Sequence, residues 1–347
     1  MTLSIIIPVY NGQAWLRRCV NSVAEELPAG ARIILVDDGS TDETAKICDE
    51  IAENDARTTV IHQSNGGLSA ARNAGLKRAD TACVTFVDCD DTVERGTLRR
   101  VMAVMEARPD VDIVEYPWRR VAGEVGPVVW PDADLADADG SPTTAMMAKN
   151  TDETVDFDHN TAKNATRRAA EYDEANGLLI LHPTDYWHRC AAYRHAYAWN
   201  KVYRRRLFDE VQFPEGRVFE DTHTLPRLLA RCERVGVTHA GCYNYYTNPQ
   251  GITQTAGARE LNDLLEGALQ LWGTPLGADR NARYYEAVLN VQIDVYERGQ
   301  LAIRLPRYEG PGPRPPKVRL ARLVGVKTVC RLSALFHKVR RAVRMGH

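Results

Sequence analysis

The sequence predicts an α/β protein with a mostly parallel central sheet flanked by helices. Two observations lead to this fold class. In the first 120 residues, short β-branched runs alternate with amphipathic segments, which is the order that places strands side by side in a parallel sheet. The chain has 347 residues, 44% hydrophobic and 26% charged. This is ordinary globular composition, and the length suits one large domain with additions or two domains.

Four short apolar runs are predicted to be strands of this sheet. They cover residues 3–9, 31–38, 58–63 and 81–88. Their side chains show little polar alternation, as in strands that are buried on both faces. A helix is predicted after each of the first three runs. We expect Asn11 to cap the first helix, and Ser40 with Glu43 to form a capping box on the second.

The remainder of the chain divides into four segments. Residues 121–182 are rich in Asp, Ala, Thr and Asn, and we interpret them as an insertion or acceptor-side region outside the sheet. Regular patterns return at 183–255, where the YNYY stretch is predicted to be a core strand. Residues 256–310 are predicted to form a helical extension, and a stiff PGPRPP linker opens the tail at 311–347.

The tail combines positive charge with an apolar stripe. From residue 317 to the end it contains many Lys and Arg residues and no acid. Its apolar residues recur at steps of three and four, at Val329, Leu332, Phe336, Val339 and Val343. Such a helix is typical of peripheral contact with an anionic membrane surface. The alternative is a solvated basic helix that packs on its own domain.

Bulk features exclude several classes of protein. The net charge of −2 argues against a general nucleic-acid binder. The eight cysteines form no CxxC pair, which favours buried thiols in a reducing compartment. No signal peptide is evident, and no run approaches the roughly 18 apolar residues of a spanning helix. We therefore expect a cytoplasmic protein, peripheral on the inner face of the cell membrane.

Polar loops follow all four predicted strands. They read YNG, DDGS, SNGG and DCDD in chain order. Because parallel strands end at the same edge of a sheet, these loops are expected to converge on one rim, where open α/β sheets bind their ligands.

Three carboxylates crowd the end of the fourth strand, at Asp88, Asp90 and Asp91. Asp88 and Asp90 are two residues apart, so on an extended chain they point the same way. Their oxygens, with Asp91 beside them, suit Mg²⁺ or Mn²⁺, which keep positions open for phosphate oxygens. The alternative is a solvated acidic turn in which Asp91 caps the next helix.

Other rim residues favour a nucleotide. Asp37 and Asp38 can accept hydrogen bonds from ribose hydroxyls or a base N–H. Gly67 allows close backbone approach, and the Arg72 guanidinium suits phosphate or a base edge. The chain contains neither GxGxxG nor GxxxxGK[ST], so dinucleotide and P-loop sites lack support.

Together, SIIIPVYNG, VDDGSTDET, NGGLSAARNAGL and FVDCDDTVE resemble the motifs of family 2 glycosyltransferases with the GT-A fold. The resemblance is dense over residues 1–116 and resumes up to about residue 250. It implies that residues 1–120 form the nucleotide-sugar-binding half of a GT-A domain. Residues 183–255 would then form the acceptor-binding half, with an ED motif.

The resemblance also implies roles for the rim residues. A nucleoside pocket would be lined by Pro8, Val9, Tyr10 and Asn11. Asp38 would contact uracil, and Arg72 would lie near the base or the phosphates. Asp88 would face the ribose and the metal, and Asp90 would be the most direct ligand of Mn²⁺ or Mg²⁺. Cys89 stands where the family usually has a small residue.

A second chemical centre is predicted at Glu220 and Asp221, where a helix should begin. Ordinary capping also explains acids in a first turn. The resemblance implies that Asp221 is the general base for the acceptor hydroxyl and that Glu220 orients the acceptor or the loop. Trp199, Asn200 and Lys201 would form an acceptor-side wall, with Trp199 as a sugar platform and Lys201 near the phosphates. A core tryptophan is the alternative.

These features predict an inverting, metal-dependent glycosyltransferase. It would move a sugar from a nucleotide-sugar, UDP-linked by the family pattern, to a glycan or lipid-linked acceptor in cell-surface polysaccharide synthesis. One alternative is a sugar-1-phosphate nucleotidyltransferase, although the first loop lacks the basic residue that such an enzyme needs. The other is a non-catalytic nucleotide-sugar-binding subunit of a glycan-assembly complex.

Overall fold

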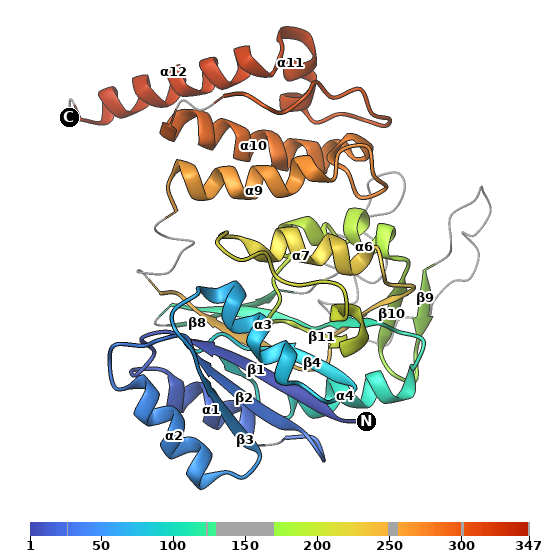
Figure 1. Ribbon diagram of the computed structural model, residues 1–347. Coiled ribbons are helices and arrows are strands. Elements are labelled where there is room, and N and C mark those ends of the chain that lie inside the picture. The colour runs from blue at the N-terminus through green and yellow to red at the C-terminus, as the bar shows by residue number, and fades with distance from the viewer. Residues whose placement is uncertain (26, 123, 130–169, 249–255, 300–301, 346–347) are drawn as a thin grey trace. The chain divides into compact units, whose positions relative to one another are not determined.

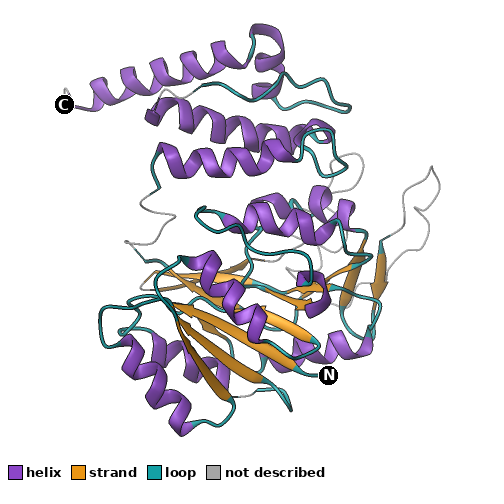
Figure 2. Cartoon of the chain, viewed as in Figure 1, coloured by secondary structure: helices purple, strands orange, loops and turns teal. Residues whose placement is uncertain are grey.

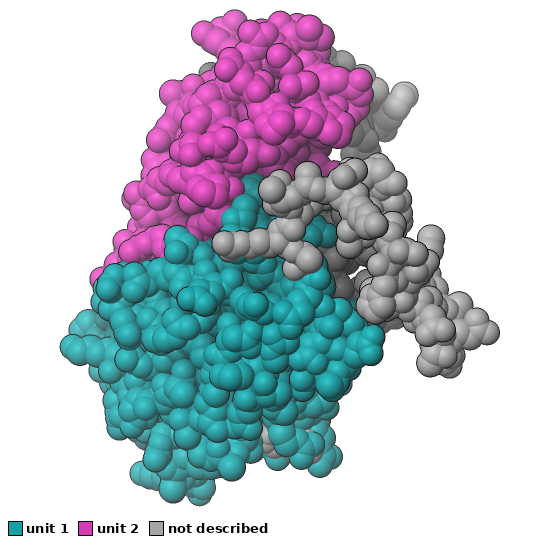
Figure 3. Space-filling model, turned by 90° about the vertical axis from the view of Figure 1, so that its right-hand side faces the viewer, with its two compact units in different colours: residues 1–212, 228–247 teal, residues 213–227, 248–347 magenta. Residues whose placement is uncertain are grey.

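The computed structural model describes residues 1–25, 27–122, 124–129, 170–248, 256–299 and 302–345 (Figure 1). The chain divides into two compact units, coloured separately in Figure 3. The first unit comprises residues 1–212 and 228–247, and the second comprises residues 213–227 and 248–347.

Within the described residues, the first unit contains a nine-stranded sheet in the order β3-β2-β1-β4-β11-β6-β12-β10-β9. Its strands are β1 (Leu3–Val9), β2 (Arg32–Asp37), β3 (Thr58–His62), β4 (Cys83–Phe86), β6 (Ile113–Glu115), β9 (Glu171–Asp173), β10 (Leu178–Leu181), β11 (Lys201–Arg204) and β12 (Val235–Thr238). Strands β10 and β11 run antiparallel to their neighbours, while β1 to β4 pair in parallel. The predicted α/β class is therefore confirmed.

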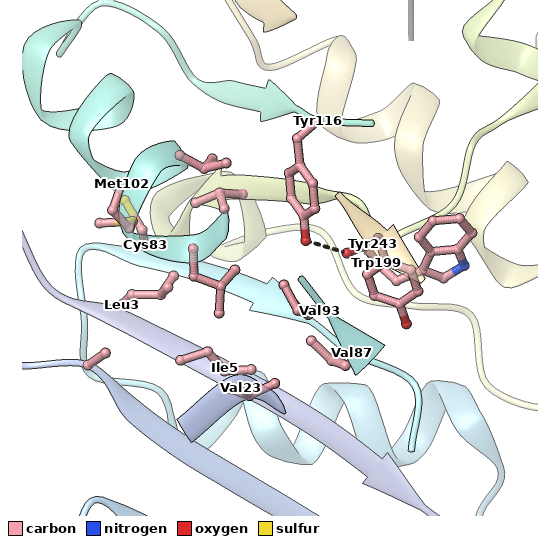
Figure 4. Close-up of a cluster of buried hydrophobic side chains, with 14 of the residues drawn as sticks. Leu3, Ile5, Val23, Cys83, Val87, Val93, Met102, Tyr116, Trp199 and Tyr243 are labelled. Atoms are coloured by element: carbon pink, nitrogen blue, oxygen red, sulfur yellow. Dashed lines mark hydrogen bonds between the residues drawn. The ribbon is translucent and has the colours of Figure 1, made fainter. Parts of the chain in front are cut away.

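Helices cover both faces of this sheet, as the purple and orange elements of Figure 2 show. The helices of the first unit are α1 (Leu16–Ala24), α2 (Thr44–Asn54), α3 (Leu68–Arg78), α4 (Thr97–Ala107), α6 (Pro183–Arg189) and the 3₁₀ turns η2 (Ala192–Arg194) and η3 (Arg205–Phe208). On one face, Leu3 and Ile5 join a core with Val23 and Met102 from α1 and α4 (Figure 4). On the other face, α3 approaches so closely that a Cβ on Gly75 would lie 2.4 Å from Ile6 Cγ2.

A smaller second sheet has the order β5-β13-β7-β8 among the described residues. Its strands are β5 (Thr92–Val93), β7 (Trp118–Ala122), β8 (Glu124–Val129) and β13 (Tyr243–Tyr246). The YNYY stretch thus forms a strand, β13, as predicted, but of its residues only Tyr243 is buried in the core. Because β5 follows the acidic turn directly, the structure does not support the alternative in which Asp91 caps a helix.

Two local predictions are wrong. The segment 121–182 is not wholly outside the sheet, because Leu178–Leu181 pairs with β12 and Glu171–Asp173 pairs with β10; residues 130–169 lie outside the described residues. The predicted capping box on α2 does not form. The helix begins at Thr44, whose amide donates instead to Asp42 Oδ1 at 3.0 Å.

The second unit is helical in the part that is described. It contains α9 (Ala258–Gln270), η4 (Ala278–Arg280), α10 (Ala282–Gly299), α11 (Pro316–Val324) and α12 (Val326–Met345). Helix α7 (Glu220–Leu229) begins in this unit. Helix α10 contacts α9, α11 and α12. No helix of the described chain has both the length and the apolar character required to cross a bilayer.

Candidate active site at the carboxyl edge of the central sheet

The loop after β1 is locked to the loop after β2. Asn11 adopts a left-handed backbone conformation with φ of 50°, which asparagine tolerates better than most residues. Its amide donates to Ser40 Oγ at 3.0 Å, and its side-chain Oδ1 accepts from the Thr41 amide at 2.8 Å. Asn11 is therefore not a helix cap, because its side chain holds the β2 loop and α1 begins only at Leu16.

The last residues of β1 lie next to the rim. The side chains of Pro8 and Val9 are buried, whereas Tyr10 is 51% exposed. Pro8 has no N–H to donate, and it is tolerated because pairing between β1 and β4 ends at Ile6 and Phe86. Of the four residues predicted to line a nucleoside pocket, Tyr10 and Asn11 are thus the ones whose side chains reach the surface.

Asp38 organises the glycine turn that follows β3. Its Oδ1 accepts from Gln63 Nε2 at 2.7 Å and from the Gly66 amide at 2.9 Å, and its Oδ2 accepts from the Gly67 amide at 2.8 Å. Gly67 has φ of 84°, a conformation that glycine adopts without strain. A carboxylate has about four lone-pair sites, and Asp38 is 3% exposed with three of them occupied, so a base N–H would have to reach the fourth.

Asp37 has a different environment from Asp38. Its Oδ1 accepts from the Ser40 amide at 3.1 Å, and its Oδ2 lies 2.9 Å from His62 Nδ1. Burial alone would raise the pKa of Asp37, but the Ser40 and His62 hydrogen bonds lower it below its usual value. His62 also lies 3.0 Å from Asp49 Oδ1, and the two carboxylates raise its pKa. The carboxylate of Asp37 is therefore engaged inside the first unit, which does not support direct nucleotide contact.

The structure brings Arg72 and Asp88 together from α3 and the end of β4. Arg72 is only 1% exposed, and one of its terminal nitrogens donates to Asp88 Oδ1 at 3.0 Å. Its guanidinium also lies over the Phe86 ring, 5.8 Å from the centroid. A fixed positive charge is thus held beside the acidic turn.

Asp91 anchors the acidic turn and does not face solvent. It is fully buried, and its Oδ2 accepts from Tyr243 Oη at 2.9 Å while its Oδ1 accepts from the Tyr246 amide at 2.7 Å. The Tyr243 hydroxyl in turn accepts from the Asp88 amide at 3.1 Å. Burial raises the pKa of Asp91 well above its usual value, and the charges of Asp88 and Asp90 raise it further.

This arrangement changes the predicted metal set. Asp91 is excluded as a ligand by its burial, which leaves the half-buried carboxylates of Asp88 and Asp90. Arg18 contacts the same turn by donating to the Asp90 carbonyl at 2.5 Å, while its guanidinium lies over the Tyr246 ring. The sequence does not identify Arg18 or Tyr243 as part of this site, because no local pattern links either residue to the acidic turn.

The two carboxylates fit a hard divalent cation. Three acidic residues within four positions bring carboxyl groups close together at this turn. Magnesium-like ions use one or two carboxylates together with phosphate oxygens. In the described part of the chain, no group of three or more His, Cys, Asp or Glu side chains is placed to hold a metal alone. A cation here would therefore need ligands from a bound phosphate or from water.

Trp199 and Lys201 are core residues, which corrects the predictions for both. Trp199 is 5% exposed and stacked between Tyr197 and Tyr243, at ring-centroid distances of 4.6 and 4.3 Å (Figure 4 shows Trp199 with Tyr243). It thus presents no open face to a sugar. The Lys201 ammonium is fully buried, 3.1 Å from Glu115 Oε1, so its charge is not directed at a phosphate.

Asn200 belongs to the same buried cluster. Its Nδ2 donates to Glu115 Oε1 at 2.9 Å and to the Tyr116 carbonyl at 3.1 Å. It holds β6 and the start of β11 together, so it is not part of an open acceptor wall.

Glu220 and Asp221 lie in the second unit, in the first turn of α7, where the sequence predicts a helix start. Glu220 is buried and Asp221 is half-buried. Phe219, directly before them, has φ of 55°, an uncommon backbone conformation for a bulky residue. Such conformations cost free energy and occur most often at functional sites, so the backbone of Phe219 favours a functional role for this turn.

The fold and its rim define the class of protein: an α/β enzyme domain of the GT-A type. The family model described as glycosyl transferase family 2 matches residues 4–211. The chain belongs to this family.

Comparisons with individual proteins agree with this assignment. The chain is 27% identical over 297 residues to the glycosyltransferase GlyA of Streptococcus pneumoniae serotype 4, covering 84% of this chain and 38% of GlyA. It is 29% identical over 256 residues to the glycosyltransferase EpsJ of Bacillus subtilis, covering 73% of this chain and 63% of EpsJ. The chain thus spans less than two thirds of the length of both relatives.

A solved structure has the same fold. The structure of S. aureus TarS residues 1–349 in complex with UDP-GlcNAc superimposes with a TM-score of 0.61 at 16% identity, covering 97% of this chain and 92% of that one. At this identity the likeness establishes the GT-A fold.

Proposed function

We propose that this protein is an inverting, metal-dependent glycosyltransferase that moves one sugar from a UDP-sugar to a hydroxyl of a glycan or lipid-linked acceptor. The observation that carries the proposal is the acidic turn itself. Asp88 and Asp90 remain half-buried beside the Arg72 guanidinium, at the rim where α/β sheets bind ligands. The relatives' names support sugar transfer, and TarS was solved with UDP-GlcNAc.

In this proposal the β1 and β2 loops hold the nucleoside. Tyr10 is exposed and offers a ring face to a base, and Asp38 has a remaining acceptor site for a base N–H. Asp37 and the Asp38–Gly67 contact keep the loops in shape before the donor binds. Preformed loops lower the entropic cost of binding.

Asp88 and Asp90 would hold Mn²⁺ or Mg²⁺, which when bound neutralises charge on the diphosphate. Arg72 adds a permanent positive charge next to Asp88. When the bond between the anomeric carbon and the phosphate oxygen breaks, its electron pair remains on the nucleoside diphosphate, and a fixed cation stabilises that leaving group.

Asp221 is the proposed general base. It would accept the proton of the acceptor hydroxyl as that oxygen forms its bond to the anomeric carbon, and a single displacement inverts the configuration. Glu220, which is buried in the same turn, would position the acceptor or the loop.

We place the reaction in cell-surface polysaccharide synthesis, at the cytoplasmic face of the cell membrane where lipid-linked acceptors are held. The support for the membrane location is the basic tail, whereas the names of the relatives EpsJ and GlyA support sugar transfer alone. A screen of nucleotide-sugars with Mn²⁺ tests the donor. UDP-sugars should raise the melting temperature and be hydrolysed slowly, and added EDTA should remove both effects.

The base is tested by Asp221→Asn. Transfer should fall by about 10²–10⁴-fold, whereas UDP affinity should not change, because the side chain is assigned to the acceptor. Asp80→Asn, which removes an exposed carboxylate of the first unit, is the matched control and should retain activity. An equal loss of UDP affinity and transfer in Asp221→Asn would contradict the assigned role.

A further inference from the structure

Helices α11 and α12 of the second unit expose large apolar side chains to solvent. Leu320, Leu323 and Val324 on α11, and Leu332, Leu335 and Phe336 on α12, are between 42% and 79% exposed. In each helix the three residues are spaced i, i+3 and i+4, so they form one stripe along the helix. We refer to these six residues as the outer face.

The outer face differs from the stripe that the sequence predicts. Val329 belongs to the buried side of α12, because it is 5% exposed. The other buried residues of the two helices are Val318, Ala321, Val326 and Cys330. Both helices contact α10. Each helix therefore has a packed apolar side that secures it to the second unit and a separate apolar side that the unit leaves exposed. The side chains of Val339 and Val343 lie outside the described residues.

The charged residues on α11 and α12 themselves have one sign, although His337 of α12 pairs with Glu297 of α10. Every charged residue from 311 to 347 is Lys or Arg, although the whole chain has a net charge of −2. The exposed ones on the described turns are Lys317, Arg319, Arg322, Lys327 and Arg331. Apolar stripes bordered by basic residues suit a surface that is apolar inside and anionic outside.

We propose that the outer face docks on an anionic lipid bilayer, with α11 and α12 lying in the plane of the headgroups. A protein partner fits less well, because the cores of protein interfaces are depleted of charged residues and five basic side chains border this face. Helix α12 is long, at Val326–Met345, but it is not apolar enough to cross a bilayer. Helices of this composition lie at the interface, with the leucine and phenylalanine side chains below the headgroups and the basic residues among them.

This inference rests on the proposed function only for the choice of leaflet, and it can be tested without any sugar. The full chain is sedimented with phosphatidylcholine vesicles that contain about 30% phosphatidylserine, and with vesicles of phosphatidylcholine alone. Binding should require phosphatidylserine and should weaken strongly at about 0.5 M salt, where the Debye length falls to a few ångströms.

Two double variants remove the electrostatic attraction to the bilayer and the burial of apolar side chains separately. Arg319→Ser with Arg322→Ser should weaken binding by about thirtyfold, at about fivefold for each basic residue. Leu323→Glu with Phe336→Glu should abolish binding. Both variants change exposed side chains, so their circular dichroism should match the unmodified protein. Arg283→Ser, an exposed position on α10, is the control and should bind normally.

Absence of sedimentation with anionic vesicles, or normal binding by both double variants, would overturn the proposal. So would a dimer in analytical ultracentrifugation that Leu323→Glu with Phe336→Glu converts to a monomer, because a second copy would then cover the outer face. Hydrolysis of a UDP-sugar, measured without vesicles, distinguishes the two proposals. It should be the same in all these variants, and its absence would concern the catalytic proposal alone.

Discussion

Carboxylates of the first unit lie in two different electrostatic environments: the buried inner cluster around Glu115, and the acidic turn of residues 88–91. In the inner cluster, Glu115 is fully buried, and the Lys201 ammonium and His195 Nδ1 lie 3.1 and 2.9 Å from its Oε1. Burial alone would raise the pKa of Glu115, but Lys201 and His195 lower it to about 2. The inner cluster therefore carries its own positive charge.

The acidic turn at the rim has three carboxylates within four residues. Arg72 pairs with Asp88, and Asp91 accepts hydrogen bonds from Tyr243 Oη and from the Tyr246 amide. Burial and the neighbouring charges raise the pKa of Asp91, the opposite direction from Glu115. Glu115 is charge-paired inside the protein, whereas the half-buried Asp88 and Asp90 lie at the rim, where carboxylates suit an external cation. The following predictions test this contrast, in order of their effect on the free energy of unfolding.

The largest effect is expected for Lys201→Met. It leaves Glu115 buried without its ammonium partner, which should lower the free energy of unfolding by about 3–5 kcal/mol. Urea unfolding at neutral pH measures this change. Lys77→Met, at an exposed position on α3, is the control and should change stability by less than about 0.5 kcal/mol. A small effect of Lys201→Met would show that the inner cluster is not a stabilising charge pair.

Acid should remove the contribution of Glu115. Its pKa is lowered from 4.5 to about 2, so its stabilisation is fully present above pH 4.5 and is lost as the pH falls toward 2. The amount is about 3 kcal/mol. The free-energy difference between the unmodified protein and Glu115→Gln should therefore shrink by this amount across that range. A difference that is constant with pH would mean that the pKa of Glu115 is not lowered.

Tyr243→Phe should have an intermediate effect. Without the hydroxyl, Asp91 loses a donor and the Asp88 amide loses its acceptor, which should cost about 1–3 kcal/mol. We also expect a smaller thermal shift with UDP and Mn²⁺, because the turn that holds Asp88 and Asp90 is loosened. Tyr203→Phe removes a buried hydroxyl that donates to the Ala198 carbonyl, and it should leave that shift unchanged. Equal shifts in the two variants would argue that Tyr243 only contributes to packing.

The smallest effect on stability is expected for Asp90→Asn. Removing one of three neighbouring negative charges should change the free energy of unfolding by less than about 0.5 kcal/mol, or raise it slightly. The Mn²⁺-dependent shift with UDP should nevertheless disappear. Calorimetry with UDP and Mn²⁺ measures the loss, and Asp80→Asn should bind normally. Unfolding of Asp90→Asn would place this residue with the inner cluster and not with the rim.

Four features could be predicted from the sequence: the α/β class, the four parallel strands, the convergence of their loops and the start of α7 at Glu220. They could be predicted because they follow from short-range patterns: apolar periodicity, turn residues, and acids in the first helical turn. The motifs at the strand ends also placed Asp38, Arg72, Asp88 and Asp90 at one rim, since parallel strands share an edge.

Only the tertiary structure decided which residues face outward. Asp91 is anchored by Tyr243, 152 residues further along the chain, and Glu115 is held by Asn200, 85 residues away. Similarly, one face of Trp199 is covered by Tyr243, which comes from a distant segment of the chain. Burial depends on such distant partners. A side chain of a given type can lie in a core or at a surface, and only the residues that pack against it in the fold exclude solvent from it.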